Sequence, residues 1–139
     1  MSYDDQNIFA KILRGELDCV KVYEDESTLA FMDIMPQTDG HTLVLPKEAA
    51  ENLLNLSDDG AAACIKTVKK VAEGVKEAMG AAGITVLQLN GAEAGQTVPH
   101  IHFHILPGSI LTAKPHAREM ADPDQLKEIG AKIAACISL

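Results

Sequence analysis

The feature that most constrains the fold is a run of seven residues, 100–106, with the sequence His-Ile-His-Phe-His-Ile-Leu. Histidines alternate there with large apolar side chains. Alternation with a period of two is typical of a β-strand that buries one face in a core. We therefore expect His100, His102 and His104 to project from one face, spaced by roughly 6.5–7 Å along the strand. The apolar residues between them would anchor the other face.

Three imidazoles on a rigid strand favour one of two chemistries. Histidine is a common ligand of zinc or iron, so His100 and His102, together with His41, could hold a metal ion. Imidazole is also a nucleophile and proton carrier whose ordinary pKa is about 6.5. A strand face that merely meets solvent is a weaker explanation, because Ser, Thr or Lys would serve better there. The run by itself leaves both chemistries open.

A loop of small residues, 91–99, leads directly into the histidine run. Gly91 and Gly95 allow the backbone to approach a ligand closely and to turn N–H groups toward it, as anion-binding loops do. Gln96 and Thr97 add side-chain donors. The loop is neither a Walker loop nor a GxGxxG turn. Beside three imidazoles, it favours an anion of the size of a phosphate.

Two more residues stand next to strand-like runs. His41 opens the run 41–46, and Asp33 closes the run 28–33. Taken alone, each is equally compatible with a structural role, as a hydrogen-bonded histidine at a strand start and as a turn-forming aspartate. Which role each of them has depends on the residues that lie beside it in the folded chain.

Residues 7–106 resemble the histidine triad (HIT) family of nucleotide hydrolases and transferases. Gly-His-Thr-Leu-Val-Leu-Pro-Lys at 40–47 and Ala-Gly-Gln-Thr-Val-Pro-His-Ile-His-Phe-His at 94–104 carry the resemblance. Alternating histidines followed by two apolar residues are the defining motif of that family. Their order and spacing are most similar to the Hint-type branch, in its bacterial form, whose members cleave purine nucleoside phosphoramidates. The resemblance implies a HIT-like α+β fold and a homodimer.

The resemblance also implies roles for the residues of the motif. His102 matches the nucleophile that attacks the α-phosphorus and forms a nucleotidyl-histidine intermediate. His104 matches the residue that contacts the phosphate and assists the leaving group. His100 and His41 match supporting histidines that orient and polarise the nucleophile. Thr97 matches a hydroxyl near the leaving group.

The implied nucleotide contacts lie on both sides of the motif. Asp33 matches a carboxylate that accepts from the ribose hydroxyls, as a carboxylate can from two donors. Gln96 matches a phosphate-side contact beside Gly95. Leu89 stands where many members carry a polar residue that faces the phosphate, and Asn90 is next in line for that contact. The slot for the base is apolar and is formed by Ile8, Phe9, Ile12, Phe31 and Ile34.

The expected function is metal-independent hydrolysis of purine nucleoside 5′-monophosphate derivatives, such as the phosphoramidates AMP-NH2 and AMP-lysine. A neutral imidazole attacks phosphorus without first losing a proton, and one hard step becomes two easier ones. No cofactor is expected, and residues 7–11 and 46–49 lack the thiols and imidazole of the zinc clip found in many bacterial relatives. The alternatives are a dinucleoside polyphosphate hydrolase or nucleotidyl transferase of the same family, a metal-binding protein, and a non-catalytic nucleotide sensor.

The composition of the chain narrows the classes of protein to which it can belong. A chain of 139 residues with 47% hydrophobic residues is expected to form one domain, 1–139, with its core at about 7–107 and a C-terminal loop and helix at 108–139. A net charge of −8 and 4% aromatic residues argue against nucleic-acid binding. No apolar run is long enough for a membrane span. Three widely spaced cysteines are typical of reduced, cytoplasmic thiols.

Periodicity and turn residues predict an α+β fold with a five-stranded antiparallel sheet, one long helix and several short ones. Strands are expected at 20–24, 28–34, 42–46, 84–90 and 98–106. Helices are expected at 5–14, from 46 to about 54, from 57 or 58 to 79, and from the Asp-Pro pair at 122–123. In the long helix, Ile65, Val68, Ala72, Val75 and Met79 form the expected core stripe. His116 lies in a loop that could reach a partner's active site.

Overall fold

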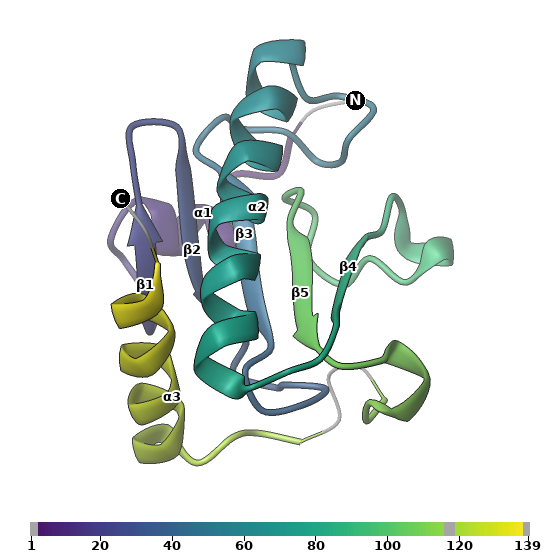
Figure 1. Ribbon diagram of the computed structural model, residues 1–139. Helices are drawn as coiled ribbons and strands as arrows, with labels where there is room; N and C mark the ends of the chain where they lie inside the picture. Colours follow the sequence, from purple (N-terminus) through teal and green to yellow (C-terminus); the bar gives the residue numbers. More distant parts are fainter. Residues whose placement is uncertain (1–2, 116–118, 138–139) are drawn as a thin grey trace.

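The computed structural model describes residues 3–115 and 119–137, and it confirms the predicted five-stranded antiparallel sheet. The strands lie in the order β1-β2-β3-β5-β4, and every neighbouring pair is antiparallel. Only β5 is out of sequence order, which places the end of the histidine run between two strands (Figure 1). The strand bounds are Lys21–Glu24 for β1, Thr28–Met32 for β2, Thr42–Pro46 for β3, Ile84–Gln88 for β4 and Phe103–Pro107 for β5.

Three α-helices surround the sheet. They are α1 (Ile8–Leu13), α2 (Asp58–Met79) and α3 (Pro123–Cys136), with two short 3-10 turns at Ala92–Ala94 and Ile110–Thr112. The predicted limits of α2 are confirmed, since the Ser57 hydroxyl accepts from the backbone N–H of Gly60 and Gly80 ends the helix with a φ of 61°. The predicted start of α3 is also confirmed, because Asp122 caps it and Pro123 is its first residue.

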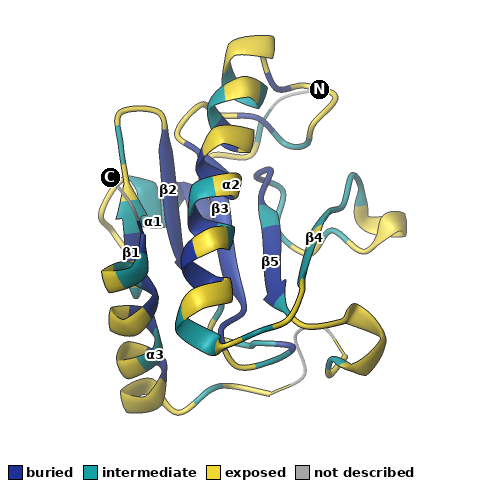
Figure 2. Ribbon diagram, viewed as in Figure 1, coloured by how far each residue is buried: buried dark blue, intermediate teal, exposed yellow. Residues whose placement is uncertain are grey.

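Different helices cover the two faces of the sheet. Helices α2 and α3 cover one face, and α1 lies on the other (Figure 1). The main core between the sheet and the two long helices includes Val44, Ile105, Val71, Val75 and Ile133. A smaller core under α1 consists of Phe9, Leu29, Phe31, Leu43 and Leu45. Strands β2 and β3 are buried along their whole length because both of their faces are covered (Figure 2).

The predicted core stripe of α2 is partly wrong. Ile65 is 54% exposed, whereas the neighbouring Cys64 is completely buried. The buried side of α2 carries small or polar residues that hydropathy undervalues, including Thr67 and Gly74. A Cβ at Gly74 would lie 2.7 Å from Cγ1 of Ile137, so this glycine permits the close approach of the C-terminal end of α3. Packing against α3 therefore sets which side of α2 faces inward.

Two further predictions about local structure are wrong. Residues 47–57 form turns rather than a short helix. Tertiary contacts hold these turns: the carbonyl of Ala50 accepts from the backbone N–H of Ile101 at 2.9 Å, and the carbonyl of Glu51 accepts from the side chain of Gln96 at 2.6 Å. The last strand begins at Phe103 rather than at residue 98. Pro99 has no N–H for a ladder, and the carbonyl of His100 accepts from a side chain, which leaves residues 98–102 irregular.

No helix within residues 3–115 and 119–137 combines the length and the apolar character that a membrane crossing would require. The three cysteines, Cys19, Cys64 and Cys136, form no disulfide. The loop residue His116 lies outside the described residues.

Candidate active site

A pocket of about 420 Å³ lies on the α1 face of the sheet. It collects nine of the residues proposed from the sequence. The polar ones are His102, His104, Thr97 and Asp33, and the apolar ones are Ile8, Phe9, Ile12, Phe31 and Ile34. Helix α1, the end of β2, the loop before β5 and β5 itself supply them. Chain segments nearly 100 residues apart thus converge on one cavity.

The ring of His102 is held in one tautomer. Its Nδ1 lies 2.7 Å from the backbone carbonyl oxygen of His100, and a carbonyl can only accept. Nδ1 therefore carries the proton, and the lone pair of the neutral ring is on Nε2. The ring of Phe9 meets the imidazole edge-to-face, with centroids 4.8 Å apart and an interplanar angle of 87°. A neutral imidazole fixed in this way is suited to nucleophilic attack through Nε2.

A second series of hydrogen bonds fixes His104. The backbone N–H of Gln37 donates to Nδ1 of His41 at 3.0 Å, so the neutral ring of His41 carries its proton on Nε2. That nitrogen lies 2.9 Å from Nδ1 of His104, which must then accept. The proton of a neutral His104 is consequently on Nε2. Since His104 also lines the pocket, the series presents an N–H donor there.

His100 does not line the pocket, although it lies on the same side of the chain as the other two histidines. Its Nε2 donates to the carbonyl of Pro46 at 2.8 Å, and its Nδ1 lies 2.6 Å from the hydroxyl of Tyr3. The side chain is completely buried, and burial holds the pKa of His100 below its ordinary value, because desolvation disfavours the charged ring. His100 shares a cavity with Ala10 and Leu13 of α1, whereas the apolar residues of the run pack in the cores on the α2 side, as the alternation predicts.

The two histidines that do share the pocket are closer than strand spacing predicts. Their ring centroids, those of His102 and His104, are 4.9 Å apart with the rings tilted by 56°. Asp33 lies beside them at the end of β2. Its Oδ1 accepts from the backbone N–H of Met35 at 2.8 Å, and its Oδ2 is 3.5 Å from Nε2 of His41. The carboxylate is therefore positioned by the turn that follows the strand and faces His41.

The loop before the histidines is held by a side chain that was expected to bind phosphate. Gln96 accepts from the N–H of Gly91 through Oε1, at 2.8 Å. Its Nε2 donates to the carbonyls of Glu51, at 2.6 Å, and Val98, at 2.9 Å. This amide ties the loop to the turns at 47–57 and does not line the pocket. A direct phosphate contact from Gln96 stays a prediction.

Gly95 and Asn90 also lie outside the lining of the pocket. Gly95 has a φ of 105°, and a Cβ there would lie 3.2 Å from Cδ1 of Leu89, so only glycine suits this turn. Asn90 accepts from the backbone N–H of Leu53 at 2.8 Å and exchanges hydrogen bonds with the side chain of Gln88. Both residues shape the loop, and their contact with a nucleotide stays a prediction.

The structure brings together a different set of potential metal ligands from the one that the sequence predicted. In the described part of the chain, potential ligand atoms of Asp33, His41 and His104 lie within 4.8 Å of one another. Nitrogens of the two histidines are hydrogen-bonded to each other at 2.9 Å, an arrangement that a cation would have to break. Both nitrogens of His100 have other partners. The set His100, His102 and His41 is therefore not assembled.

Several lining residues were not foreseen from the sequence. Leu43 is one, although it follows His41 by two residues and alternation would have placed it on the same face. The others have no recognisable pattern, since they lie between α1 and β1 or at the ends of β2 and the loop. They are Leu17, Asp18, Cys19, Met32 and Val98.

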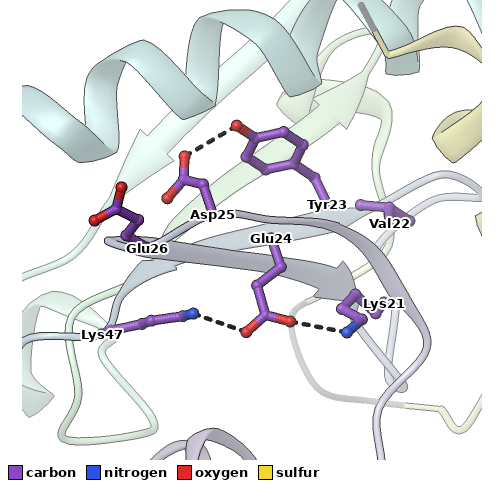
Figure 3. Close-up of a pocket in the computed structure, with 7 residues that line it drawn as sticks. All are labelled: Lys21, Val22, Tyr23, Glu24, Asp25, Glu26 and Lys47. Carbon is purple, nitrogen blue, oxygen red and sulfur yellow. Dashed lines mark hydrogen bonds and ion pairs between the residues drawn. The ribbon is translucent and has the colours of Figure 1, made fainter. Parts of the chain in front are cut away.

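A second, open cleft of about 640 Å³ runs along the β1–β2 hairpin (Figure 3). Charged side chains that line this cleft form ion pairs with one another. Glu24 pairs with Lys21 and with Lys47, each at 2.8 Å, and these partners lower the pKa of Glu24 to about 2. The hydroxyl of Tyr23 donates to Asp25 at 2.9 Å. Among the residues that the structure describes, no histidine or cysteine lines this cleft, so the pocket on the α1 face is the candidate site.

Comparisons with known proteins agree with this geometry. The family model described as HIT domain matches residues 14–110. Protein hit of Bacillus subtilis is 40% identical over 133 residues, with 91% of each chain covered. Adenosine 5′-monophosphoramidase of Schizosaccharomyces pombe is 39% identical over 139 residues, covering 94% of this chain and 97% of that protein.

A solved structure of similar extent is a Hit-like protein involved in cell-cycle regulation from Bartonella henselae. It superimposes with a TM-score of 0.92 at 46% identity and covers 99% of this chain and 100% of that one. Its likeness extends to the C-terminal helix, beyond the residues matched by the family model. With the sequence motif, the sheet order and the two fixed imidazoles, these matches establish that the chain belongs to the HIT domain family.

Proposed function

We propose that the protein hydrolyses purine nucleoside 5′-monophosphate derivatives, with phosphoramidates such as AMP-NH2 or AMP-lysine as its substrates. The observation that carries this proposal is the pair of fixed tautomers in one pocket. Nε2 of His102 holds a lone pair, and Nε2 of the neighbouring His104 holds a proton. An apolar slot extends from them under α1. The similarity to a relative named adenosine 5′-monophosphoramidase supports the same substrate class.

The proposed reaction has two steps. Nε2 of His102 attacks the α-phosphorus, a new phosphorus–nitrogen bond forms, and the bond to the leaving amine breaks. The amine takes one proton as it leaves, and Thr97 Oγ1 and His104 Nε2 are the proton-bearing groups that line the pocket there. Water then attacks the nucleotidyl-histidine, returns the electron pair to His102 and replaces the proton. While it carries its proton, Nε2 of His104 also donates to a non-bridging phosphate oxygen and stabilises the charge there.

The nucleoside follows from the layout of the pocket. Asp33 lines the same cavity as His102, His104 and the apolar residues of α1, and we propose that it accepts from the ribose hydroxyls. Phe9, Phe31 and Ile34 would then sandwich the base. One cavity thus offers both polar groups and apolar surface, as a nucleoside monophosphate requires.

The deciding experiment measures AMP release from adenosine 5′-phosphoramidate in excess chelator, for the native protein and for His102→Ala. We expect turnover by the native protein, none above background by the variant, and a covalent adenylate on the native protein after rapid acid quenching, detected by mass spectrometry. Turnover that chelator abolishes would instead support a metal site at Asp33, His41 and His104. AMP binding without turnover would indicate a nucleotide sensor.

We also propose a homodimer formed along the β4 edge of the sheet. Strand β4 ends the sheet, and such an edge can pair with another strand. Apolar side chains are exposed on β4 and on α2, with Val86 45% and Ile65 54% accessible. Light scattering after size exclusion should give twice the chain mass, and Val86→Lys should shift the protein toward monomer. A native monomer at micromolar concentration would contradict the proposal.

A further inference from the structure

The N-terminal segment contacts His100 in a cavity separate from the pocket. The hydroxyl of Tyr3 lies 2.6 Å from Nδ1 of His100, and the two rings meet edge-to-face with centroids 5.7 Å apart. Asn7, the cap of α1, donates to the same hydroxyl at 2.9 Å. Both Tyr3 and Asn7 precede residue 14, where the match to the family begins. This contact is thus an addition to the motif itself.

The direction of each hydrogen bond follows from its partners. Because Nε2 of His100 donates to the carbonyl of Pro46, Nδ1 of the neutral ring is an acceptor. The hydroxyl of Tyr3 therefore donates to His100 and accepts from Asn7. The backbone carbonyl of His100 in turn accepts from Nδ1 of His102 at 2.7 Å. Two sets of hydrogen bonds thus meet at His100: those from the cap of α1 hold its ring, and its backbone carbonyl holds the ring proposed as the nucleophile.

We propose that Tyr3 is a positioning residue: together with the carbonyl of Pro46 it holds the ring of His100 neutral and in one orientation, and so fixes the position of the backbone carbonyl of His100 that keeps the lone pair of His102 on Nε2. The proposal rests on the proposed function for its effect on rate. Tyr3 does not line the pocket, so it would touch neither the nucleotide nor the reacting atoms. Its ring packs against a side chain that is completely buried, where a missing donor leaves a nitrogen without compensation.

The surroundings of His100 explain why one donor matters. Asp5, Arg14 and Lys47 line the small cavity that Tyr3 and His100 share. Arg14 bonds to Glu16 and to the carbonyl of Asp5, and Lys47 pairs with Glu24. The neutral donor to Nδ1 is the tyrosine hydroxyl. Without it, the neutral ring of His100 loses a hydrogen bond that the protonated ring cannot accept, so the pKa of His100 should rise.

The test is Tyr3→Phe, which keeps the packed ring and removes only the hydroxyl. The chain offers a matched control in its other tyrosine, Tyr23, whose hydroxyl donates to Asp25 in the hairpin cleft (Figure 3). The same hydroxyl accepts from Lys70 of α2. With adenosine 5′-phosphoramidate we expect Tyr3→Phe to lower kcat about tenfold with KM nearly unchanged, as the loss of one buried hydrogen bond would. The acid limb of its pH profile should move to higher pH. Tyr23→Phe should leave both unchanged.

A readout that needs no turnover separates this inference from the proposed function. In protein labelled with ¹⁵N-histidine, the ring nitrogens of His100 and His102 should each report a single neutral tautomer, protonated on Nε2 and on Nδ1 respectively. In Tyr3→Phe the His102 signals should shift toward a mixture of tautomers, whereas Tyr23→Phe should match the native spectrum. Unchanged histidine shifts in Tyr3→Phe would overturn the inference, whether or not the protein cleaves the phosphoramidate. If Tyr3→Phe lowers the melting temperature but leaves the histidine ¹⁵N shifts unchanged, Tyr3 only stabilises the fold.

Discussion

The proposed ribose contact of Asp33 can be tested with one substitution and two substrates. Asp33→Asn keeps an oxygen in the position where Oδ1 accepts from the N–H of Met35, so the turn after β2 should survive. It replaces the second oxygen, 3.5 Å from Nε2 of His41, with an amide and removes the negative charge. Hydrogen bonds to a charged group contribute about 1.5–3 kcal/mol. A loss of about 2 kcal/mol corresponds to a roughly 30-fold fall in kcat/KM.

The second substrate separates the ribose from the histidines. A 2′,3′-dideoxy nucleoside phosphoramidate has no hydroxyls for Asp33 to bind. If the carboxylate holds the ribose, Asp33→Asn should cost about 30-fold with the ribonucleoside and only a few-fold with the dideoxy compound. Any effect through His41 would appear equally with both substrates. Equal losses for the two substrates would refute the ribose contact and assign Asp33 to the support of His41.

Three smaller predictions concern thiols, pH and packing. Cys19 lines the pocket, so AMP should slow its reaction with a thiol reagent, whereas Cys64, whose pKa burial raises to about 12, should react only after unfolding. Because lysine partners lower the pKa of Glu24 from 4.5 to about 2, the stability difference between the native protein and Glu24→Gln should shrink as the pH falls through that range, and it should be under about 1 kcal/mol since the pair is exposed. The buried hydroxyls of Thr28 and Thr67 lie 2.7 Å apart, and Thr67→Val should cost about 1–3 kcal/mol in urea unfolding. Equal labelling of Cys19 with and without AMP, a stability difference for Glu24→Gln that grows as the pH falls, or native stability of Thr67→Val would contradict the respective prediction.

Local signals in the sequence were sufficient for most of the fold. The cap and terminal glycine of α2 bound that helix correctly, and the Asp-Pro pair placed the start of α3. These signals work because caps and turns are satisfied by residues within a few positions of one another. The strands were found for the same reason, since alternation depends only on neighbouring side chains. Their ends were less accurate where a distant partner decides the last hydrogen bond.

The chemical types in the site were also readable from sequence, but their arrangement was not. Alternation placed three imidazoles on one side of the chain, and the tertiary structure decides that two of them line the pocket while His100 is buried outside it. Its ring is held by Tyr3, 97 residues away, and by the carbonyl of Pro46, 54 residues away. Which nitrogen of His104 carries a proton depends on His41, 63 positions earlier in the chain.

The sequence by itself thus determined the family motif, the order of the elements and the residues available for chemistry. The tertiary structure alone decided the tautomers of the histidines, the structural rather than lining position of Gln96, and the exposure of Ile65. The physical reason is common to all three. A tautomer, a side-chain hydrogen bond and the inward face of a helix are each set by a partner that is close in space and remote in the chain, and local periodicity carries no information about that partner.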